Sequence, residues 1–151
     1  MPMANIAASE LVGDLMGEHL FDLILAIKRK CQRNEEQIQE ELGLSQAQFN
    51  ALIVMDDDRE VSGCEFARRM ALSPSRGSRI LNTLVTAGHA RVASGPEDRR
   101  AIMISLTPEG KVIKQGIIGR MAACESRISA GLDPTSVAQV RHALELLETV
   151  L

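Results

Sequence analysis

The chain has 151 residues, of which 45% are hydrophobic, 25% are charged and 2% are aromatic. This length fits one folded domain with helical extensions, and the composition is that of a globular protein rather than a disordered one. No apolar run approaches the ~18 residues of a membrane span, and no secretory signal begins at Met1, so we expect a cytoplasmic protein. Three cysteines, Cys31, Cys64 and Cys124, lie too far apart for a disulfide framework or a CxxC metal site.

The net charge of −3 is unevenly distributed along the chain. Residues 1–58 carry 4 basic and 11 acidic residues, residues 59–120 carry 11 and 5, and residues 121–151 carry 2 and 4. A basic centre between acidic ends is typical of a binding site for a polyanion such as nucleic acid. The acidic total therefore does not exclude a DNA-binding protein.

The first predicted element is a long amphipathic helix from Ser9 to about Asn34, in which apolar residues recur at helical spacing. Gly43 interrupts this pattern. Residues 45–48 form a capping box, which predicts a second helix that begins there. That helix ends at Asp56-Asp57-Asp58, which we interpret as a solvated turn rather than a cation site.

The central elements follow closely on one another. A second capping box at residues 62–65 predicts a short helix through Met70, and Ser73-Pro74 predicts another that ends before Gly88. Two short strands, at residues 90–93 and 102–106, flank a turn-rich charged loop and predict a β-hairpin. Two further helices begin after Thr107 and Asp133, and the last one has an apolar seam that resembles a short coiled coil.

Two short helices, a tight connection and a β-hairpin predict a winged helix-turn-helix. The second helix has an outward face with hydroxyl, amide and guanidinium groups, and no acidic residue lies between Ser73 and Ala87. Such groups bind base edges and phosphates in a major groove, although a merely solvated face is the alternative. The residues expected to contact DNA are Ser73, Ser75, Arg76, Ser78, Arg79 and Asn82 on this helix and Arg99 and Arg100 on the hairpin.

The sequence here resembles the MarR (multiple-antibiotic-resistance regulator) family of transcription factors. The motif that carries the resemblance is Asp98-x-Arg100, five residues, then Leu106-Thr107-x-x-Gly110. Residues 72–75, Arg79 and Gly88 match the recognition-helix region of the family. The resemblance extends from about Leu20 to Leu151 and is most specific at residues 60–110. Gly77 and His89-Ala90 depart from the family, which usually has apolar residues there.

The resemblance implies an α+β, mostly α, winged helix-turn-helix fold with long N- and C-terminal dimerisation helices. We expect residues 1–44 and 111–151 to dimerise and residues 45–110 to form the DNA-binding lobe, within one compact domain overall. Each recognition helix would enter a major groove and each wing a minor groove. Arg100 would contact DNA, and Asp98 would orient it through a carboxylate–guanidinium pair.

We therefore expect a homodimeric regulator of double-stranded DNA, commonly a repressor in this family, that a small aromatic acid releases from a pseudo-palindromic operator. A redox-responsive regulator that uses a cysteine is one alternative, although we expect the cysteines to pack as small hydrophobic residues. A protein–protein module on a winged-helix scaffold is another. We expect no enzyme, because the sequence has no catalytic constellation, and neither a cofactor nor a metal site.

Overall fold

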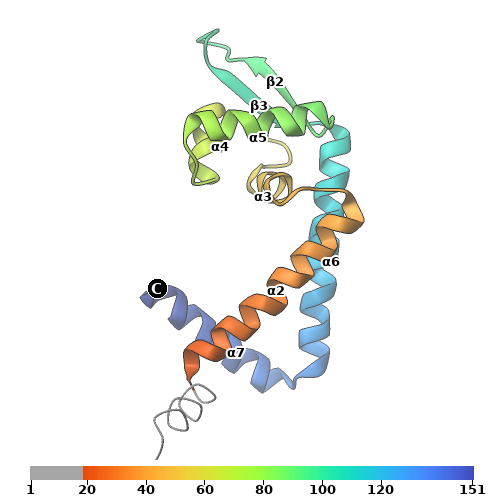
Figure 1. The fold of residues 1–151 in the computed structure, drawn as a ribbon, viewed down its shortest axis with the longest axis vertical. Coiled ribbons are helices and arrows are strands. Elements are labelled where there is room, and N and C mark those ends of the chain that lie inside the picture. The colour runs from red at the N-terminus through yellow and green to blue at the C-terminus, as the bar shows by residue number, and fades with distance from the viewer. Residues whose placement is uncertain (1–18) are drawn as a thin grey trace, which may run out of the picture. The chain divides into compact units, whose positions relative to one another are not determined.

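The computed structural model describes residues 19–151, and the chain divides into two compact units, residues 1–41 and 42–151. Helix α2 (Leu20–Leu42) provides nearly all of the described part of the first unit (Figure 1). Several large apolar side chains near its beginning are exposed, namely Leu20, Phe21, Leu23 and Ile27. The predicted positions Leu11 and Leu15 lie outside the described residues.

The predicted end of the first helix near Asn34 is wrong, because α2 continues to Leu42. Residues 35–42 are mostly Glu, Gln and Leu, which are strong helix formers. Side-chain hydrogen bonds at i,i+4 from Gln32 to Glu36 and from Gln37 to Glu41 support the added turns. Gly43 follows with a φ of +66°, a left-handed conformation that favours glycine and ends the helix.

The second unit contains the elements predicted for a winged helix-turn-helix, followed by two long helices (Figure 1). They are α3 (Gln46–Val54), β1 (Val61–Ser62), α4 (Gly63–Arg69), α5 (Pro74–Thr86), β2 (Ala90–Ser94), β3 (Ile102–Leu106), α6 (Pro108–Gly131) and α7 (Pro134–Val150). The predicted fold class is therefore confirmed. Strand β1 was not predicted, because two residues are too few to show a periodic pattern. No helix in residues 19–151 is long and apolar enough to cross a membrane.

The three strands form one antiparallel sheet in the order β1-β3-β2. Val61 of β1 and Val92 of β2 both pair with Ile104 of the central strand. Ile104 is completely buried, whereas β2 is exposed after its first residue, Ala90. The hairpin therefore begins inside the core and projects from it, as a wing does.

Helices α3 to α6 and the sheet share an apolar core. Its largest fully buried side chains are Phe49, Leu52, Met55, Phe66, Leu84, Ile104 and Ile117. The capping box at Ser45 is confirmed, with both reciprocal hydrogen bonds present. The box predicted at Ser62 is only half formed, because Ser62 caps the backbone of Glu65 while the Glu65 carboxylate binds two arginines instead.

The Asp56-Asp57-Asp58 turn does not match the interpretation of a simply solvated turn. Each of its three carboxylates pairs with a cation, from α4 in one case and from α6 in the other two. Periodicity could not predict these pairs, because their partners lie 13 to 57 positions further along the chain.

Candidate nucleic-acid interface

Helix α5 presents one polar face to solvent and buries the opposite face. Gly77, Leu81 and Leu84 are buried, and they fix the orientation of the helix on the core. All six residues predicted to contact DNA from this helix are exposed, namely Ser73, Ser75, Arg76, Ser78, Arg79 and Asn82. Ser73 is the N-cap, and its hydroxyl accepts a hydrogen bond from the Arg76 backbone N–H at 3.4 Å. The predicted side chains thus form one continuous exposed face.

Gly77 explains how α4 and α5 approach so closely. A Cβ atom built on Gly77 would lie 2.9 Å from the Ala67 Cβ and 3.3 Å from the Ala67 Cα. Real Cβ atoms do not come so near one another, so only glycine fits at this crossing. The departure from the family at Gly77 is therefore compensated by close helix packing, and the cost of ~1 kcal/mol for a helical glycine has a structural reason.

The wing places Arg99 and Arg100 at an exposed tip, as predicted. Asp98 acts on Arg100 differently from the expectation: its Oδ1 accepts a hydrogen bond from the Arg100 backbone N–H at 2.8 Å. Within residues 19–151 no ion pair joins the Asp98 carboxylate to the Arg100 guanidinium, so the implied carboxylate–guanidinium pair is wrong in this structure. Asp98 shapes the turn that carries Arg100, which is the role of an Asx turn.

The second half of the motif joins the start of α6 to the turn between α5 and β2. Thr107 caps α6 by accepting the Gly110 N–H at 3.0 Å, and its own hydroxyl donates to the Gly88 carbonyl. The Thr107 N–H donates to the His89 carbonyl at 3.0 Å. A Cβ on Gly110 would lie 1.9 Å from that carbonyl oxygen, so the motif requires glycine there for steric reasons.

A network of charges lies on α4, next to the recognition helix. The Glu65 carboxylate binds Arg68 and Arg69, both at 2.8 Å, and these hydrogen bonds lower the pKa of Glu65 to about 2. The Arg68 side chain is 75% exposed, which leaves it accessible to a phosphate. Arg68 was not among the residues predicted to contact DNA, although its position in the basic central segment was a signal.

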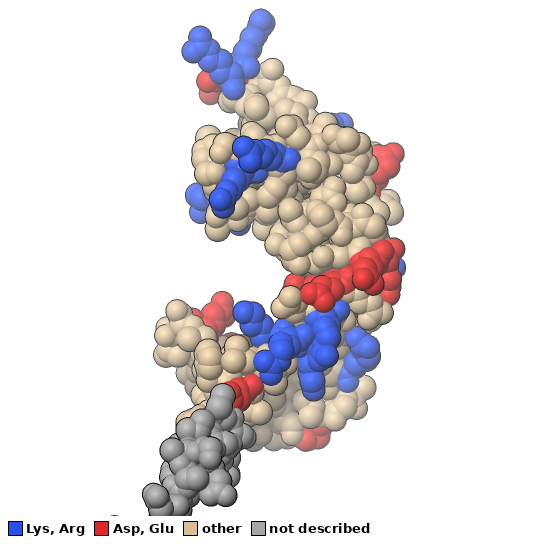
Figure 2. All heavy atoms as spheres, in the orientation of Figure 1, with Lys and Arg blue, Asp and Glu red and all other residues tan. Residues whose placement is uncertain are grey.

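Arg91 is a second cation that sequence reasoning missed. It is exposed on β2, and its Nε donates to the Ser105 hydroxyl of the paired strand at 2.9 Å. The alternation of side chains along β2 could have indicated its outward direction. Figure 2 shows Lys and Arg side chains at the wing tip and over the helix-turn-helix region.

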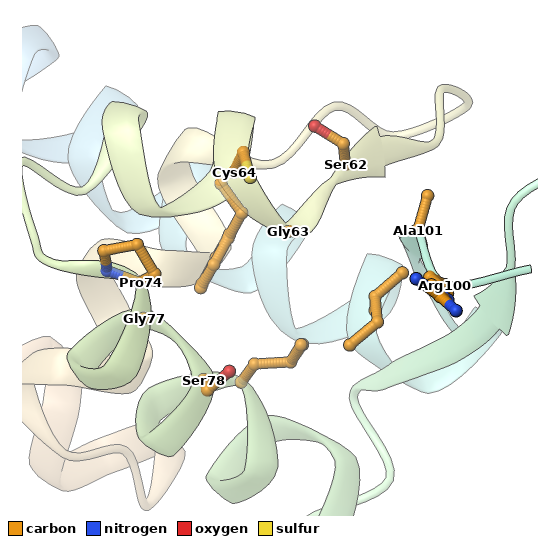
Figure 3. A pocket seen from close by; sticks show the side chains of 11 residues that line it. Ser62, Gly63, Cys64, Pro74, Gly77, Ser78, Arg100 and Ala101 are labelled. Carbon is orange, nitrogen blue, oxygen red and sulfur yellow. The ribbon is translucent and has the colours of Figure 1, made fainter. Parts of the chain in front are cut away.

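A hollow of about 240 Å³ lies between α5, the start of α4 and the wing segment Arg100 to Ile102. Figure 3 shows Arg100 and Ala101 of the wing on one side of it, and Ser78 of α5 with Cys64 of α4 on the other. The structure therefore brings Arg100 and Ser78, which are 22 positions apart, to one surface. The hollow is lined by Ser62, Gly63, Cys64, Phe66, Pro74, Gly77, Ser78, Leu81, Arg100, Ala101 and Ile102.

The cysteines do not pack as predicted. Cys31 and Cys64 are exposed, and Cys124 is half-buried on α6. The expectation that all three serve as small core residues is therefore not met by Cys31 and Cys64.

Comparison with known proteins relates this geometry to one family. The MarR family model matches residues 42–101, which span α3 to the wing tip. The uncharacterised protein Rv2011c of Mycobacterium tuberculosis is 27% identical over 119 residues, which cover 79% of this chain and 82% of that protein. YfiV of Bacillus subtilis, an uncharacterised HTH-type transcriptional regulator, is 24% identical over 110 residues, 73% of this chain and 69% of its own.

Solved structures have the same fold. YusO of Bacillus subtilis superposes with a TM-score of 0.74 at 23% identity and covers 96% of this chain and 99% of its own. MarR of E. coli without ligand gives 0.71 at 21% identity, over 85% and 96%. BpsR of Bordetella bronchiseptica, whose DNA binding is regulated by 6-hydroxynicotinic acid, gives 0.62 at 21% identity, over 87% and 94%.

Proposed function

We propose that this chain is a winged-helix transcription regulator of the MarR family rather than an enzyme, and that it binds a pseudo-palindromic DNA operator as a homodimer; the family model over residues 42–101 and the shared fold support this proposal. The observation that carries this proposal is the acid-free exposed face of α5 beside a wing that ends in Arg99 and Arg100. A folded lobe with this surface is suited to duplex DNA, because cations attract phosphates while short polar groups discriminate between base edges. The proposal places the protein in the cytoplasm, with the DNA.

The two basic elements contribute in different ways under this proposal. Arg76 and Arg79 lie in the first two turns of α5, the part of a recognition helix that contacts base edges. Arg100 lies at the wing tip, where a guanidinium can enter a narrow minor groove and respond to its potential. Replacement of Arg100 by alanine should therefore weaken binding to all sequences evenly and reduce its salt dependence.

Exposed apolar side chains on the C-terminal helices support dimerisation. Val140 and Leu144, which lie one turn apart on α7, and Leu146 of α7 and Ile118 of α6 are each about half exposed. Exposed apolar side chains that share a helix face, as Val140 and Leu144 do, are suited to contact with a second copy. A second copy with two-fold symmetry would cover this surface and separate the recognition helices by ~34–36 Å, one turn of DNA. Sedimentation should show a dimer for the wild type and for the neighbouring control variant Glu145→Gln. Leu144→Asp should dissociate, and a folded wild-type monomer contradicts the proposal.

We further propose that the dimer represses transcription and that a small aromatic acid releases it. The regulation of BpsR by 6-hydroxynicotinic acid supports this choice of ligand class. Fluorescence anisotropy of a bound duplex during titration with aromatic carboxylates tests the release. If no acid releases the DNA but reversible oxidation does, the exposed thiols Cys31 and Cys64 favour the redox alternative instead.

Selection of bound duplexes from random DNA tests the central proposal. We expect an inverted repeat with one dominant half-site spacing, and a variant with Arg76 and Arg79 both replaced by alanine should select no sequence. If the wild type also selects none, while it remains folded and dimeric, the protein–protein alternative replaces DNA binding.

A further inference from the structure

The α3–β1 loop is attached to α6 by an ion pair between Asp57, whose side chain is 37% exposed, and Lys114, whose side chain is largely buried. Asp57 Oδ1 lies 2.7 Å from Lys114 Nζ, and Asp57 Oδ2 accepts a hydrogen bond from Gln115 Nε2 at 3.0 Å. The Lys114 ammonium also donates to the Met55 backbone carbonyl at the start of the same loop. The Lys114 side chain is 12% exposed, and its hydrogen bond holds the pKa of Asp57 below the usual value. We call Asp57, Lys114 and Gln115 the Asp57 clamp.

The same loop is attached to the helix-turn-helix on its other side. Arg69 of α4 donates through Nη1 to the Val54 carbonyl and to Asp56 Oδ2, both at 3.0 Å. The Arg69 Nε donates to Glu65 Oε1 at 2.8 Å. The loop thus connects α4, which packs against the recognition helix, to α6 through directional polar contacts on both sides.

Within residues 19–151, polar contacts attach α6 to the winged-helix region at successive points along the helix, and the clamp lies beyond the exposed Lys111–Asp58 pair. The first is at the N-terminus of the helix, where Thr107 and Gly110 contact the turn after α5. A helix held only at its end can pivot about that end. Lys114 lies one turn further along than Gly110, so a directional contact through its largely buried ammonium restricts the direction in which α6 leaves the core, together with the buried side chain of Ile117.

We propose that the Asp57 clamp sets the angle between the winged-helix region and α6 and thereby the half-site spacing that the dimer accepts. This inference rests on the proposed function. Helix α6 continues 17 residues beyond Lys114, to Gly131, which is about 25 Å of helix. A rotation of ~8° at the clamp therefore moves its far end by ~3.5 Å relative to the recognition helix, the separation of one base pair.

The test compares two ion pairs that join the same loop to the same helix and differ in exposure. Lys114→Met removes the clamp and keeps a long apolar side chain, which leaves no unpaired buried ammonium. Lys111→Met is the matched control: it removes the same charge and breaks the Lys111–Asp58 pair, whose side chains are 40% and 87% exposed. Asp57→Asn serves as a second variant, because it removes the clamp charge from the other partner with little change in volume.

The measurement is the affinity of the full-length protein for duplexes with its selected half-sites at a series of spacings. The wild type and Lys111→Met should prefer one spacing, and Lys114→Met should lower that preference by about 2- to 30-fold at unchanged half-site sequence. Backbone amide hydrogen exchange at residues 55–60 should be faster in Lys114→Met than in the wild type and in Lys111→Met. This measurement reports the opening of the loop independently of DNA. If Lys114→Met does not fold, Asp57→Asn must give the same loss.

Three results separate the possible failures. If the wild type discriminates spacing and both clamp variants discriminate it equally well, the clamp inference is overturned while the proposed function stands. The clamp inference is also overturned if Lys111→Met changes the preference as much as Lys114→Met, because the effect is then one of charge alone. If the wild type binds no DNA at all, the proposed function fails with it.

Discussion

The role of Asp98 can be isolated by two substitutions that change charge equally. Asp98→Ala and Asp98→Asn both remove one negative charge from the wing tip. Asparagine keeps a side-chain oxygen that can accept the Arg100 N–H, whereas alanine does not. The removed charge affects attraction to phosphates in the same way in both variants. Any difference in DNA affinity between them therefore reports the turn that carries Arg100.

The size of that difference follows from the single exposed hydrogen bond that alanine loses. Such a bond contributes about 0.5–1 kcal/mol, at the lower end of the usual range, because water competes for both groups. Asp98→Ala should accordingly bind DNA about 2- to 5-fold more weakly than Asp98→Asn. Asp98→Asn should bind DNA at least as tightly as the wild type does, because it removes one negative charge that repels the phosphates.

Fluorescence anisotropy with one labelled operator duplex, repeated at several salt concentrations, measures this difference. The two variants should have equal salt slopes and different affinities. In an Arg100→Ala background the difference should disappear, because no guanidinium remains to be positioned. Equal affinities of Asp98→Ala and Asp98→Asn would refute the reasoning, and a difference that persists without Arg100 would show that Asp98 acts on another residue.

Gly77→Ala should lower the free energy of unfolding by about 1–3 kcal/mol in urea denaturation, because its methyl group would overlap that of Ala67. Gly119→Ala on α6, where the added methyl group would meet no side chain or neighbouring element within 4 Å, should instead raise it by about 0.4–1 kcal/mol. Arg76→Ala should cost about 1–3 kcal/mol on the preferred operator and relax selection at one or two base pairs per half-site, as repeated selection from random DNA would show. Because the pKa of Glu65 is lowered from 4.5 to about 2, its ion pairs stabilise the fold above pH 4.5 and lose that effect as pH falls towards 2. The difference in Tm between the wild type and Glu65→Gln should therefore be constant near neutral pH and shrink below pH 4.5, and a difference that grows in acid contradicts this sign.

Most elements of the fold could be predicted from local sequence. Ser45, Ser73 and Thr107 each cap a helix as predicted, and Gly88 ends one, because caps depend on side chains within three residues of the backbone groups they bind. The wing was predictable as well, because its two strands flank a turn-rich loop. The end of α2 was mispredicted, since the amphipathic pattern fades after Asn34 while helix propensity continues to Leu42.

The candidate site was predictable in composition and not in geometry. The residue types on α5 and at the wing tip already indicated a polyanion partner, and the exposure of these side chains agrees with that prediction. The contact between Asp98 and Arg100 was expected between side chains, whereas the structure shows it to the backbone. A separation of two residues in the sequence does not determine whether a carboxylate contacts the guanidinium or the backbone amide of the second residue. The conformation of the turn decides which of these two groups lies near the carboxylate.

The sequence by itself determined the element types, the basic centre and the MarR-family motif, since all three depend on residues close together in the chain. Only the tertiary structure decided why glycine is required at positions 77 and 110. Ala67 and the His89 carbonyl come near these positions through the packing of separate elements, and they leave no room for a Cβ atom. The tertiary structure also decided that Asp57 pairs with Lys114, 57 positions away. Such contacts depend on how helices cross, and that depends on the whole apolar core rather than on any local pattern.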